Sequence, residues 1–405
     1  MMLEGLTTEE LIAAGKAVVM NTYGRLPVAI AKGEGSWVWD VEGKRYLDFV
    51  TGLAVNSLGH KHPAVVQAIQ KQAEEILHTS NLYWIPNQIA LAQRLTENSF
   101  ASKVFFCNSG AEANEAAIKL ARKYAKKKYG EHKFEIISLA NSFHGRTLAT
   151  LTATGQAKYQ EGYAPLPAGF SYVDINDIEG LKAKVTENTA ALLLEPIQGE
   201  GGVNPASKEF LQTARELCDA YGALLIFDEV QVGVGRTGKL FAHEWSGIAP
   251  DVMTLAKALG GGVPIGAMLA TEEAALAFQP GDHASTFGGN PLATAVGCAV
   301  LGVMLAEGFF EGVQERAAYF RAGLENLAAK YRTGEAVRGQ GFILGWPLPK
   351  LGPEIVEYCR QEGLLINCIG GKVLRFLPPL TVKKEEIDQA LGILDEVFAK
   401  HWTID

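Results

Sequence analysis

The sequence predicts an α/β protein in which helices cover both faces of a mostly parallel sheet. Short runs rich in apolar and β-branched residues alternate with segments whose apolar residues recur every three or four positions. Runs that are apolar on both faces are typical of parallel strands buried between helices. The chain has 405 residues, 48% of them hydrophobic, which is enough for one large core and a smaller one.

Six short runs in the middle of the chain are the predicted strands of this sheet. They lie at residues 103–107, 134–139, 190–195, 223–228, 251–255 and 265–270. Helical patterns occur between several of them, for example at residues 111–127 and 208–221.

The two ends of the chain lie outside this repeating pattern. Residues 37–49 predict a β-hairpin with its turn at Glu42-Gly43-Lys44. After a long apolar helix from Leu292, we expect strands at 342–346 and 373–376 and an amphipathic helix at 384–401. The predicted parts are an N-terminal segment (1–55) that packs with a small domain, a large α/β domain (56–300) and a small α+β domain (301–405).

Charge and composition exclude several classes of protein. The net charge of −8 offers no positive background for a polyanion, so we expect no nucleic-acid partner. The basic cluster at residues 119–128 has helical spacing and is expected to be a solvated helix face. The five cysteines are odd in number and form no CxxC pair, which argues against disulfides and a zinc site. His60 and His62 lack a third metal ligand and are expected near a helix cap.

The sequence shows no pattern of a signal peptide or a membrane span. The N-terminus lacks a basic segment followed by an apolar one. The longest nearly uncharged run, residues 292–306, is shorter than the roughly 20 residues that a span needs, and it contains Gly297 and Gly302. We therefore expect a buried helix there and a cytoplasmic protein without a membrane partner.

A candidate phosphate site follows the first predicted strand. Asn108-Ser109-Gly110-Ala111 joins this strand directly to a helix, so free backbone N–H groups and the Ser109 hydroxyl gather at a helix N-terminus. The helix dipole favours an anion at this point. The same residues also fit an ordinary helix cap, and this segment alone does not decide between the two interpretations.

Asp228 and Lys257 stand at the ends of two further strands. The carboxylate of Asp228 could hold a protonated pyridine nitrogen, cap the next turn or serve a nucleotide site. Lys257 lies among apolar residues and glycines, and desolvation lowers the pKa of an ammonium group, as Schiff-base formation with an aldehyde requires. A phosphate cradle, an acid and a lysine on one sheet together favour a covalently held cofactor that carries a phosphate.

A glycine-rich run offers a nucleotide-binding alternative that its context opposes. GVGRTG (233–238) matches GxGxxG and, with Lys239, also matches GxxxxGK. It follows residues 229–231, which we expect to be exposed, and no helix is expected to open after it. Leu240 stands where a magnesium ligand is needed, so we predict no nucleotide site.

Six motifs resemble, in order, those of the class III or ω-amino-acid aminotransferases. They are NSGAEAN (108–114), SFHGRT (142–147), EPIQGEGG (195–202), FDEVQVGVGRTG (227–238), TLAKALGGG (254–262) and STFGGNP (285–291). The likeness runs from about residue 20 to the end of the chain. It implies PLP fold type I, with a large domain built on a mostly parallel seven-stranded sheet, the cofactor pyridoxal 5'-phosphate (PLP) and a homodimer.

The resemblance also implies a set of cofactor contacts. Lys257 holds the cofactor covalently and shuttles a proton, and Asp228 pairs with the pyridinium nitrogen. Phe143 stacks on the ring, His144 lies in the same site, and Gln231 hydrogen-bonds the ring hydroxyl. The phosphate is held by Ser109, Gly110 and Ala111 and is also reached by Thr286 of the partner subunit.

The substrate contacts implied by the resemblance must serve two unlike substrates. Arg375 binds the α-carboxylate of glutamate, while Arg146 with Tyr23 and Asn81 receives the far end of the amine donor. An amine donor without that carboxylate would leave Arg375 buried and unpaired. We therefore predict that Glu200 pairs with Arg375 in that case and swings away for glutamate. The alternative is a loop glutamate fixed by its flanking glycines.

The expected reaction transfers the terminal amino group of N-acetylornithine to 2-oxoglutarate, a step of arginine biosynthesis. The stretches HTSNLYW (78–84) and LRFLPPL (374–380) favour this amine donor within the family. Ornithine, succinylornithine, succinyldiaminopimelate and 4-aminobutyrate remain alternatives, because residues at a pocket's edge decide between such substrates. A PLP-binding protein without transferase activity would lack the substrate clamp, and Arg146 and Arg375 argue against it.

Overall fold

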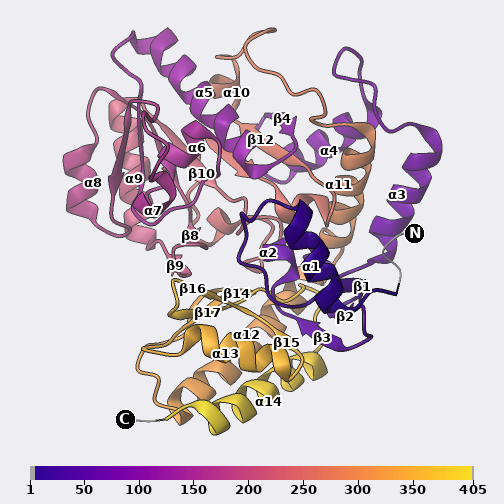
Figure 1. Cartoon of the computed structure of the whole chain (residues 1–405). Helices are drawn as coiled ribbons and strands as arrows, with labels where there is room; N and C mark the ends of the chain where they lie inside the picture. The colour runs from indigo at the N-terminus through magenta and orange to yellow at the C-terminus, as the bar shows by residue number, and fades with distance from the viewer. Residues whose placement is uncertain (1–4, 404–405) are drawn as a thin grey trace.

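The computed structural model describes residues 5–403, and its centre is a seven-stranded sheet (Figure 1). In spatial order the strands are β4 (Lys103–Cys107), β12 (Gly266–Ala270), β11 (Val252–Leu255), β10 (Leu224–Asp228), β7 (Thr189–Leu194), β5 (Glu135–Leu139) and β6 (Phe170–Val173). Within this described sheet only β12 runs antiparallel to its neighbours. The predicted mostly parallel sheet is confirmed. The six predicted strands are all present, with ends within one residue of those expected.

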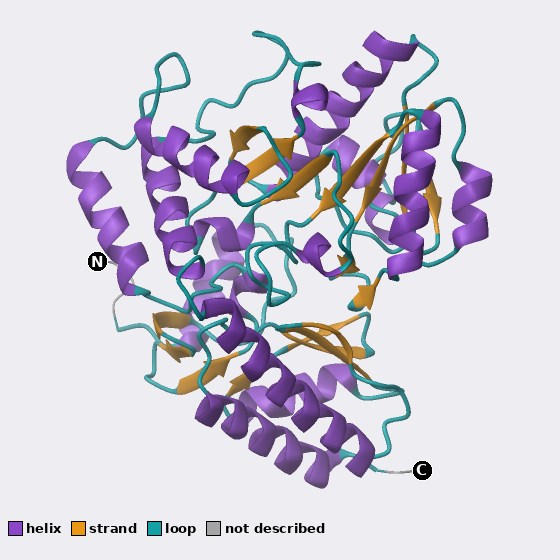
Figure 2. Cartoon of the chain, turned by 180° about the vertical axis from the view of Figure 1, so that it is seen from behind, coloured by secondary structure: helices purple, strands orange, loops and turns teal. Residues whose placement is uncertain are grey.

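Helices lie on both sides of the large sheet (Figure 2), and alternate residues of its central strands pack against one side or the other. Ile226 of β10 lies in one apolar cluster with residues of α5 (Gly110–Tyr129). Phe227, the next residue, lies in a second cluster with residues of α9 (Lys208–Tyr221). Burial on both faces is the reason why these strands are continuous apolar runs in the sequence. Shorter helices beside them are α6 (Leu148–Ala153), α7 (Ala157–Gln160), α8 (Ile178–Lys184) and α10 (Glu272–Ala275).

Three helices beside the sheet begin with proline at their first position. They are α3 (Pro63–Glu75), α4 (Pro86–Glu97) and α11 (Pro291–Met304). Proline is well suited to this position, because the first N–H of a helix has no partner within the helix. His62 caps α3 by accepting from the backbone N–H of Ala64, and His60 pairs with Asp48 at 2.8 Å. The helix-cap interpretation of these histidines is therefore confirmed for His62.

The long apolar run is a buried helix, as predicted. α11 packs against α3 and α4, and its residues Val296, Val300 and Leu301 are wholly buried. Among residues 5–403, no single helix is both long and apolar enough to cross a membrane. α11 and α12 (Phe309–Lys330) reach that length and composition only as a pair that is bent by 74°.

The N-terminal strands pair with a segment from near the other end of the chain. β1 (Ile30–Glu34), β2 (Trp37–Asp40) and β3 (Arg45–Asp48) lie side by side, and β15 (Leu364–Leu365) joins β3 in parallel. The predicted hairpin is β2 with β3. β1 and β15 were missed, because β1 is mostly exposed and β15 has only two residues.

The C-terminal residues form a second four-stranded sheet, below the large sheet in the view of Figure 1. Its antiparallel strands are β13 (Arg338–Gln340), β14 (Ile343–Pro347), β17 (Val373–Phe376) and β16 (Asn367–Ile369). Trp346 of β14 stacks on Phe398 of the last helix with 4.5 Å between ring centroids. The predicted strands and final helix are confirmed. The remaining elements are α1 (Thr8–Val18), α2 (Thr51–Ala54), α13 (Gly352–Gln361), α14 (Lys384–His401), β8 (Ile197–Gln198), β9 (Asn204–Pro205), η1 (Ala242–Trp245) and η2 (Lys257–Gly260).

Candidate active site

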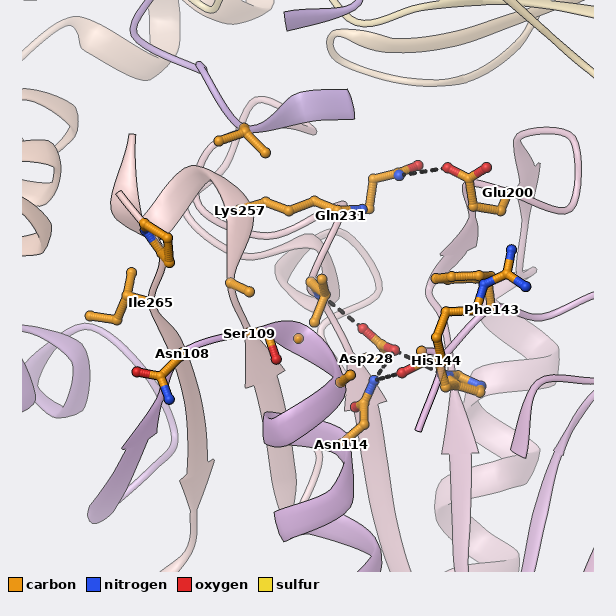
Figure 3. Close-up of a pocket in the computed structure, with 18 of the residues that line it drawn as sticks. Asn108, Ser109, Asn114, Phe143, His144, Glu200, Asp228, Gln231, Lys257 and Ile265 are labelled. Carbon is orange, nitrogen blue, oxygen red and sulfur yellow. Dashed lines mark hydrogen bonds and ion pairs between the residues drawn. The ribbon is translucent and has the colours of Figure 1, made fainter. Parts of the chain in front are cut away.

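A cavity of about 490 Å³ lies at the carboxyl ends of the parallel strands (Figure 3). Segments that follow β4, β5, β7, β10 and β11 line it, and this edge is where open α/β sheets bind ligands. Its size suits a small molecule. Ten residues predicted for the cofactor or the substrates lie on its wall: Ser109, Gly110, Ala111, Phe143, His144, Arg146, Glu200, Asp228, Gln231 and Lys257.

The start of α5 combines a helix cap with an open anion cradle. The Ser109 hydroxyl accepts from the backbone N–H of Glu112 at 3.2 Å, so the cap interpretation holds. The N–H groups of Gly110 and Ala111 have no acceptor among residues 5–403 and remain available at the cavity wall. A Cβ on Gly110 would lie 2.6 Å from Cγ1 of Val230, so the close approach needs glycine. The geometry therefore fits a phosphate as well.

Asp228 is a buried carboxylate that faces the cavity from the end of β10. Its Oδ2 accepts from Nδ2 of Asn114 at 2.7 Å and lies 2.8 Å from Nδ1 of His144 (Figure 3). Its Oδ1 accepts from the backbone N–H of Val230 at 3.0 Å. Within residues 5–403, no lysine or arginine forms an ion pair with Asp228. A cation in the cavity would therefore meet an oriented carboxylate.

Lys257 is the first residue of η2 and is partly buried at the cavity wall. Burial lowers the pKa of its ammonium group and Arg375 lowers it further, while Glu200 and Asp228 oppose this shift. The direction of the shift is the predicted one. Its backbone φ of +44° is the left-handed conformation that side chains other than glycine rarely adopt. Such strain is concentrated at functional sites.

Arg375, which is buried, and Glu200, which is half-buried, form an ion pair beside the cavity. Nη1 of Arg375 lies 2.6 Å from Oε1 of Glu200 and donates to Oε1 of Gln231 at 3.1 Å. Nε donates to Oδ1 of Asn367 at 3.2 Å, and Nη2 is buried without a partner among the residues described. Burial acts to raise the pKa of Glu200, but Arg375 outweighs it and holds this pKa below its usual range. The structure thus contains the paired arrangement predicted for an amine donor that has no carboxylate on its reacting, amine-bearing carbon.

The side chains of Phe143 and Arg146 form another part of the wall. The guanidinium carbon of Arg146 lies 4.0 Å from the ring centroid of Tyr159 and 5.4 Å from that of Phe143. Arg146 has no carboxylate partner within residues 5–403. A planar cation that is held by two aromatic rings and free of a counter-ion can receive a carboxylate or carbonyl group.

The sequence profile described as "Aminotransferase class-III" matches residues 18–398. The chain belongs to the class III aminotransferases. It is 56% identical to the "Acetylornithine aminotransferase" of Caldanaerobacter subterraneus subsp. tengcongensis over 391 residues, which are 96% of this chain and 99% of that protein. It is therefore an enzyme that moves amino groups between amino acids and keto acids, and its cofactor is PLP.

Two solved structures are similar over nearly the whole aminotransferase. The ornithine aminotransferase of Toxoplasma gondii, described with partial occupancy of PLP at its active site, has a TM-score of 0.94 at 34% identity and covers 98% of this chain and 96% of its own. The acetylornithine aminotransferase of Elizabethkingia anophelis has a TM-score of 0.88 at 34% identity and covers 98% of this chain and 100% of its own.

Three predicted site residues of the aminotransferase lie away from the cavity of their own chain. Tyr23 is 70% exposed, and Thr286 is also exposed. Asn81 is exposed as well and donates from Nδ2 to the carbonyl oxygens of Ser285 and Gly288. It therefore fastens the segment that carries Thr286. None of the three lines the cavity that holds Lys257.

Two residues in the aminotransferase site were missed by the sequence analysis. Asn114 donates to Asp228 and to the carbonyl oxygen of His144, and its Oδ1 accepts from the Thr254 hydroxyl at 2.7 Å. The sequence indicated Asn114 by its position, because it is a polar residue on the buried face of α5, one turn after the cradle. Glu195 directly follows β7, just as Asp228 is the last residue of β10. An acidic residue at the end of a buried strand therefore indicated Glu195 in the same way as Asp228.

The glycine-rich run is a series of turns without a following α-helix, as expected. The expectation that residues 229–231 are exposed was wrong. Glu229 is 1% exposed, because its carboxylate accepts backbone N–H groups of Ala242 and His243. Arg236 is also wholly buried and donates to Ser57 and to two carbonyl oxygens, and burial lowers its pKa to about 9.

Within residues 5–403, no group of three or more potential metal ligands occurs.

Proposed function

We propose that this aminotransferase transfers the terminal amino group of N-acetylornithine to 2-oxoglutarate, producing N-acetylglutamate 5-semialdehyde and glutamate in arginine biosynthesis. The observation that carries the proposal is the Glu200–Arg375 pair at 2.6 Å, because it would neutralise the carboxylate receptor while an amine donor without a carboxylate on its reacting, amine-bearing carbon is bound. The 56% identity to an acetylornithine aminotransferase supports the same substrate.

The residues of the cavity fit PLP at several points. The free N–H groups of Gly110 and Ala111, with the Ser109 hydroxyl, would hold the phosphate, and Asp228 would hold the protonated ring nitrogen. The side chains of Phe143, His144, Gln231 and Lys257 complete the proposed cofactor site. When bound, the cofactor supplies an electron sink for the bonds at the substrate's amine-bearing carbon.

The chain's own groups then have separate tasks. The lowered pKa of Lys257 leaves its Nζ able to act as a nucleophile and to move a proton at the amine-bearing carbon. The free Nη2 of Arg375 would receive one oxygen of the glutamate α-carboxylate after Glu200 leaves. Arg146 would receive the far end of either substrate. Because one pocket alternates between two substrates, the cycle is of the ping-pong type.

We further propose that the enzyme acts as a cytoplasmic homodimer, in which Thr286, Asn81 and Tyr23 complete the site of the partner subunit. Their exposure in the single chain supports this arrangement. Large apolar side chains beside them are also exposed, which is typical of a protein interface. They include Met20 (84%), Leu82 (85%), Tyr83 (70%), Trp84 (89%) and Phe287 (60%).

A single-turnover comparison of amine donors tests the proposed substrate. The PLP-loaded enzyme is mixed with N-acetylornithine, ornithine, succinylornithine, succinyldiaminopimelate or 4-aminobutyrate, and the change in cofactor absorption is followed. We expect N-acetylornithine to give the largest ratio of rate to dissociation constant. A ratio for another donor that is more than about tenfold higher would replace N-acetylornithine as the substrate.

A further inference from the structure

Glu195 is a carboxyl group of the cavity whose hydrogen-bond partners, within residues 5–403, are backbone N–H groups. It lies directly after β7 and is 6% exposed. Its Oε2 accepts from the backbone N–H of Phe143 at 3.0 Å, and its Oε1 accepts from that of Gly199 at 3.4 Å. Within residues 5–403, no lysine, arginine or histidine forms an ion pair with it.

The basic groups near Glu195 are not available to neutralise a negative charge on it. Asp228 approaches from β10 and Glu200 from the segment after β8, so two further carboxyl groups line the same cavity. Arg375 is already bound to Glu200 at 2.6 Å, and burial favours the neutral amine of Lys257. A third carboxylate at this point would be a buried negative charge without compensation.

We propose that Glu195 is a positioning residue that functions as an uncharged carboxylic acid and ties the backbone of Phe143 to that of Gly199. It would thereby connect the ring-stacking side chain with the segment that carries Glu200. Because it is neutral, it does not compete with Asp228 for the cofactor's ring nitrogen or with Glu200 for Arg375. Burial and the neighbouring Asp228 raise the pKa of Glu195 well above its usual range and outweigh the two backbone N–H groups that donate to it and act to lower this pKa.

The first test measures the charge state of Glu195 through the pH dependence of protein stability and needs no measurement of turnover. A carboxyl group with a raised folded pKa keeps a proton that the unfolded chain releases above its ordinary pKa, so stability falls as pH rises between these values. Glu195→Gln has no such proton. With saturating PLP and equal protein concentrations, we expect the difference in melting temperature, Glu195→Gln minus wild type, to increase by about 1–2 °C per pH unit as the pH rises above the ordinary glutamate pKa of about 4.3.

Glu161→Gln is the matched control, because Glu161 is an exposed glutamate, and its difference from wild type should be independent of pH. The proposal is overturned if the Glu195→Gln difference is also independent of pH or decreases as pH rises. Failure of Glu195→Gln to fold would overturn it as well, since glutamine has nearly the shape and charge of the neutral acid.

The second test separates charge from hydrogen bonding. Glu195→Gln still offers an oxygen to Phe143, so we expect its kcat to stay within about threefold of wild type and its PLP to survive dialysis. Glu195→Ala removes both contacts and should lose at least about tenfold in kcat and release PLP more readily. Equal losses in the two variants would overturn the proposal. The Phe143 part of this inference rests on the proposed cofactor site, whereas the melting test of charge does not.

Discussion

At the scale of single residues, the site separates its charges by giving each ionisable group a different set of partners. Asp228 is held by Asn114, His144 and a backbone N–H, whereas Glu200 is held by Arg375 and Gln231. Lys257 makes no ion pair with any residue between 5 and 403 and has a lowered pKa. Groups with such different environments can hold different protonation states at one pH, which acid–base chemistry requires.

Lys257 should therefore react with an aldehyde at a lower pH than an ordinary lysine. Its neutral amine appears as the pH rises through its lowered folded pKa, below the roughly 10.4 of a free side chain. Borohydride trapping of PLP on the cofactor-free protein, followed by peptide mapping, measures this. We expect labelling of Lys257 with a midpoint below that value, and no turnover for Lys257→Ala. Labelling of a different lysine, or near wild-type turnover of Lys257→Ala, would contradict the assignment.

At the scale of elements, the sequence predicts those parts whose pattern is local. The ends of α9 and α14 agree with the predicted helices, because regular apolar spacing defines both and Ser207 caps the start of α9. β6 was missed because it has four mostly half-buried residues, and β15 because its partner β3 lies more than three hundred positions away in the chain. Asp228 and Lys257, which both line the cavity, were predicted as site residues because they stand at or just after the ends of buried strands. The pairing of Arg375 with Glu200 spans 175 positions and depends on tertiary packing, so only family resemblance indicated it.

The junction between β4 and α5 offers a test at this scale. In Gly110→Ala the added methyl would lie 2.6 Å from a methyl of Val230, so the cradle must shift. We expect PLP to bind at least about tenfold more weakly, as measured by fluorescence titration, while the cofactor-free protein keeps its helical circular dichroism. Gly15→Ala is the control, because it lies in α1 with open space around the added Cβ. Equal PLP affinity in Gly110→Ala and wild type would show that the cradle does not hold the phosphate.

At the scale of the whole molecule, one chain gathers the proposed cofactor residues other than Thr286 and leaves Thr286 and two proposed substrate residues, Asn81 and Tyr23, exposed. Asn81 donates a hydrogen bond to the segment that carries Thr286, whereas Tyr23 lies far earlier in the sequence. The division into parts 1–55, 56–300 and 301–405 stays a prediction. The parallel pairing of β15 with β3 nevertheless joins the first and last of these parts.

Mixed dimers test whether two chains share a site. Lys257→Ala homodimers should be inactive, and Thr286→Ala homodimers should be weakened by the lost phosphate contact. When equal amounts of the two variants are refolded together, about half of the dimers contain one chain of each variant. Each such mixed dimer has one intact site, with Lys257 from one chain and Thr286 from the other. About a quarter of wild-type activity should therefore return. Activity that equals the mean of the two separate variants would mean that Thr286 serves its own chain or no site.

The central claim is that Glu200 allows one pocket to accept both glutamate and an amine donor without a carboxylate on its reacting, amine-bearing carbon. Stopped-flow measurement of the two half-reactions of Glu200→Ala, through the cofactor's visible absorption, tests it most directly. Removal of Glu200 leaves Arg375 buried and unpaired when N-acetylornithine binds, so that half-reaction should slow by at least about tenfold. The half-reaction with glutamate should be equally fast or faster, because Arg375 is already free. Equal slowing of both half-reactions would contradict the account.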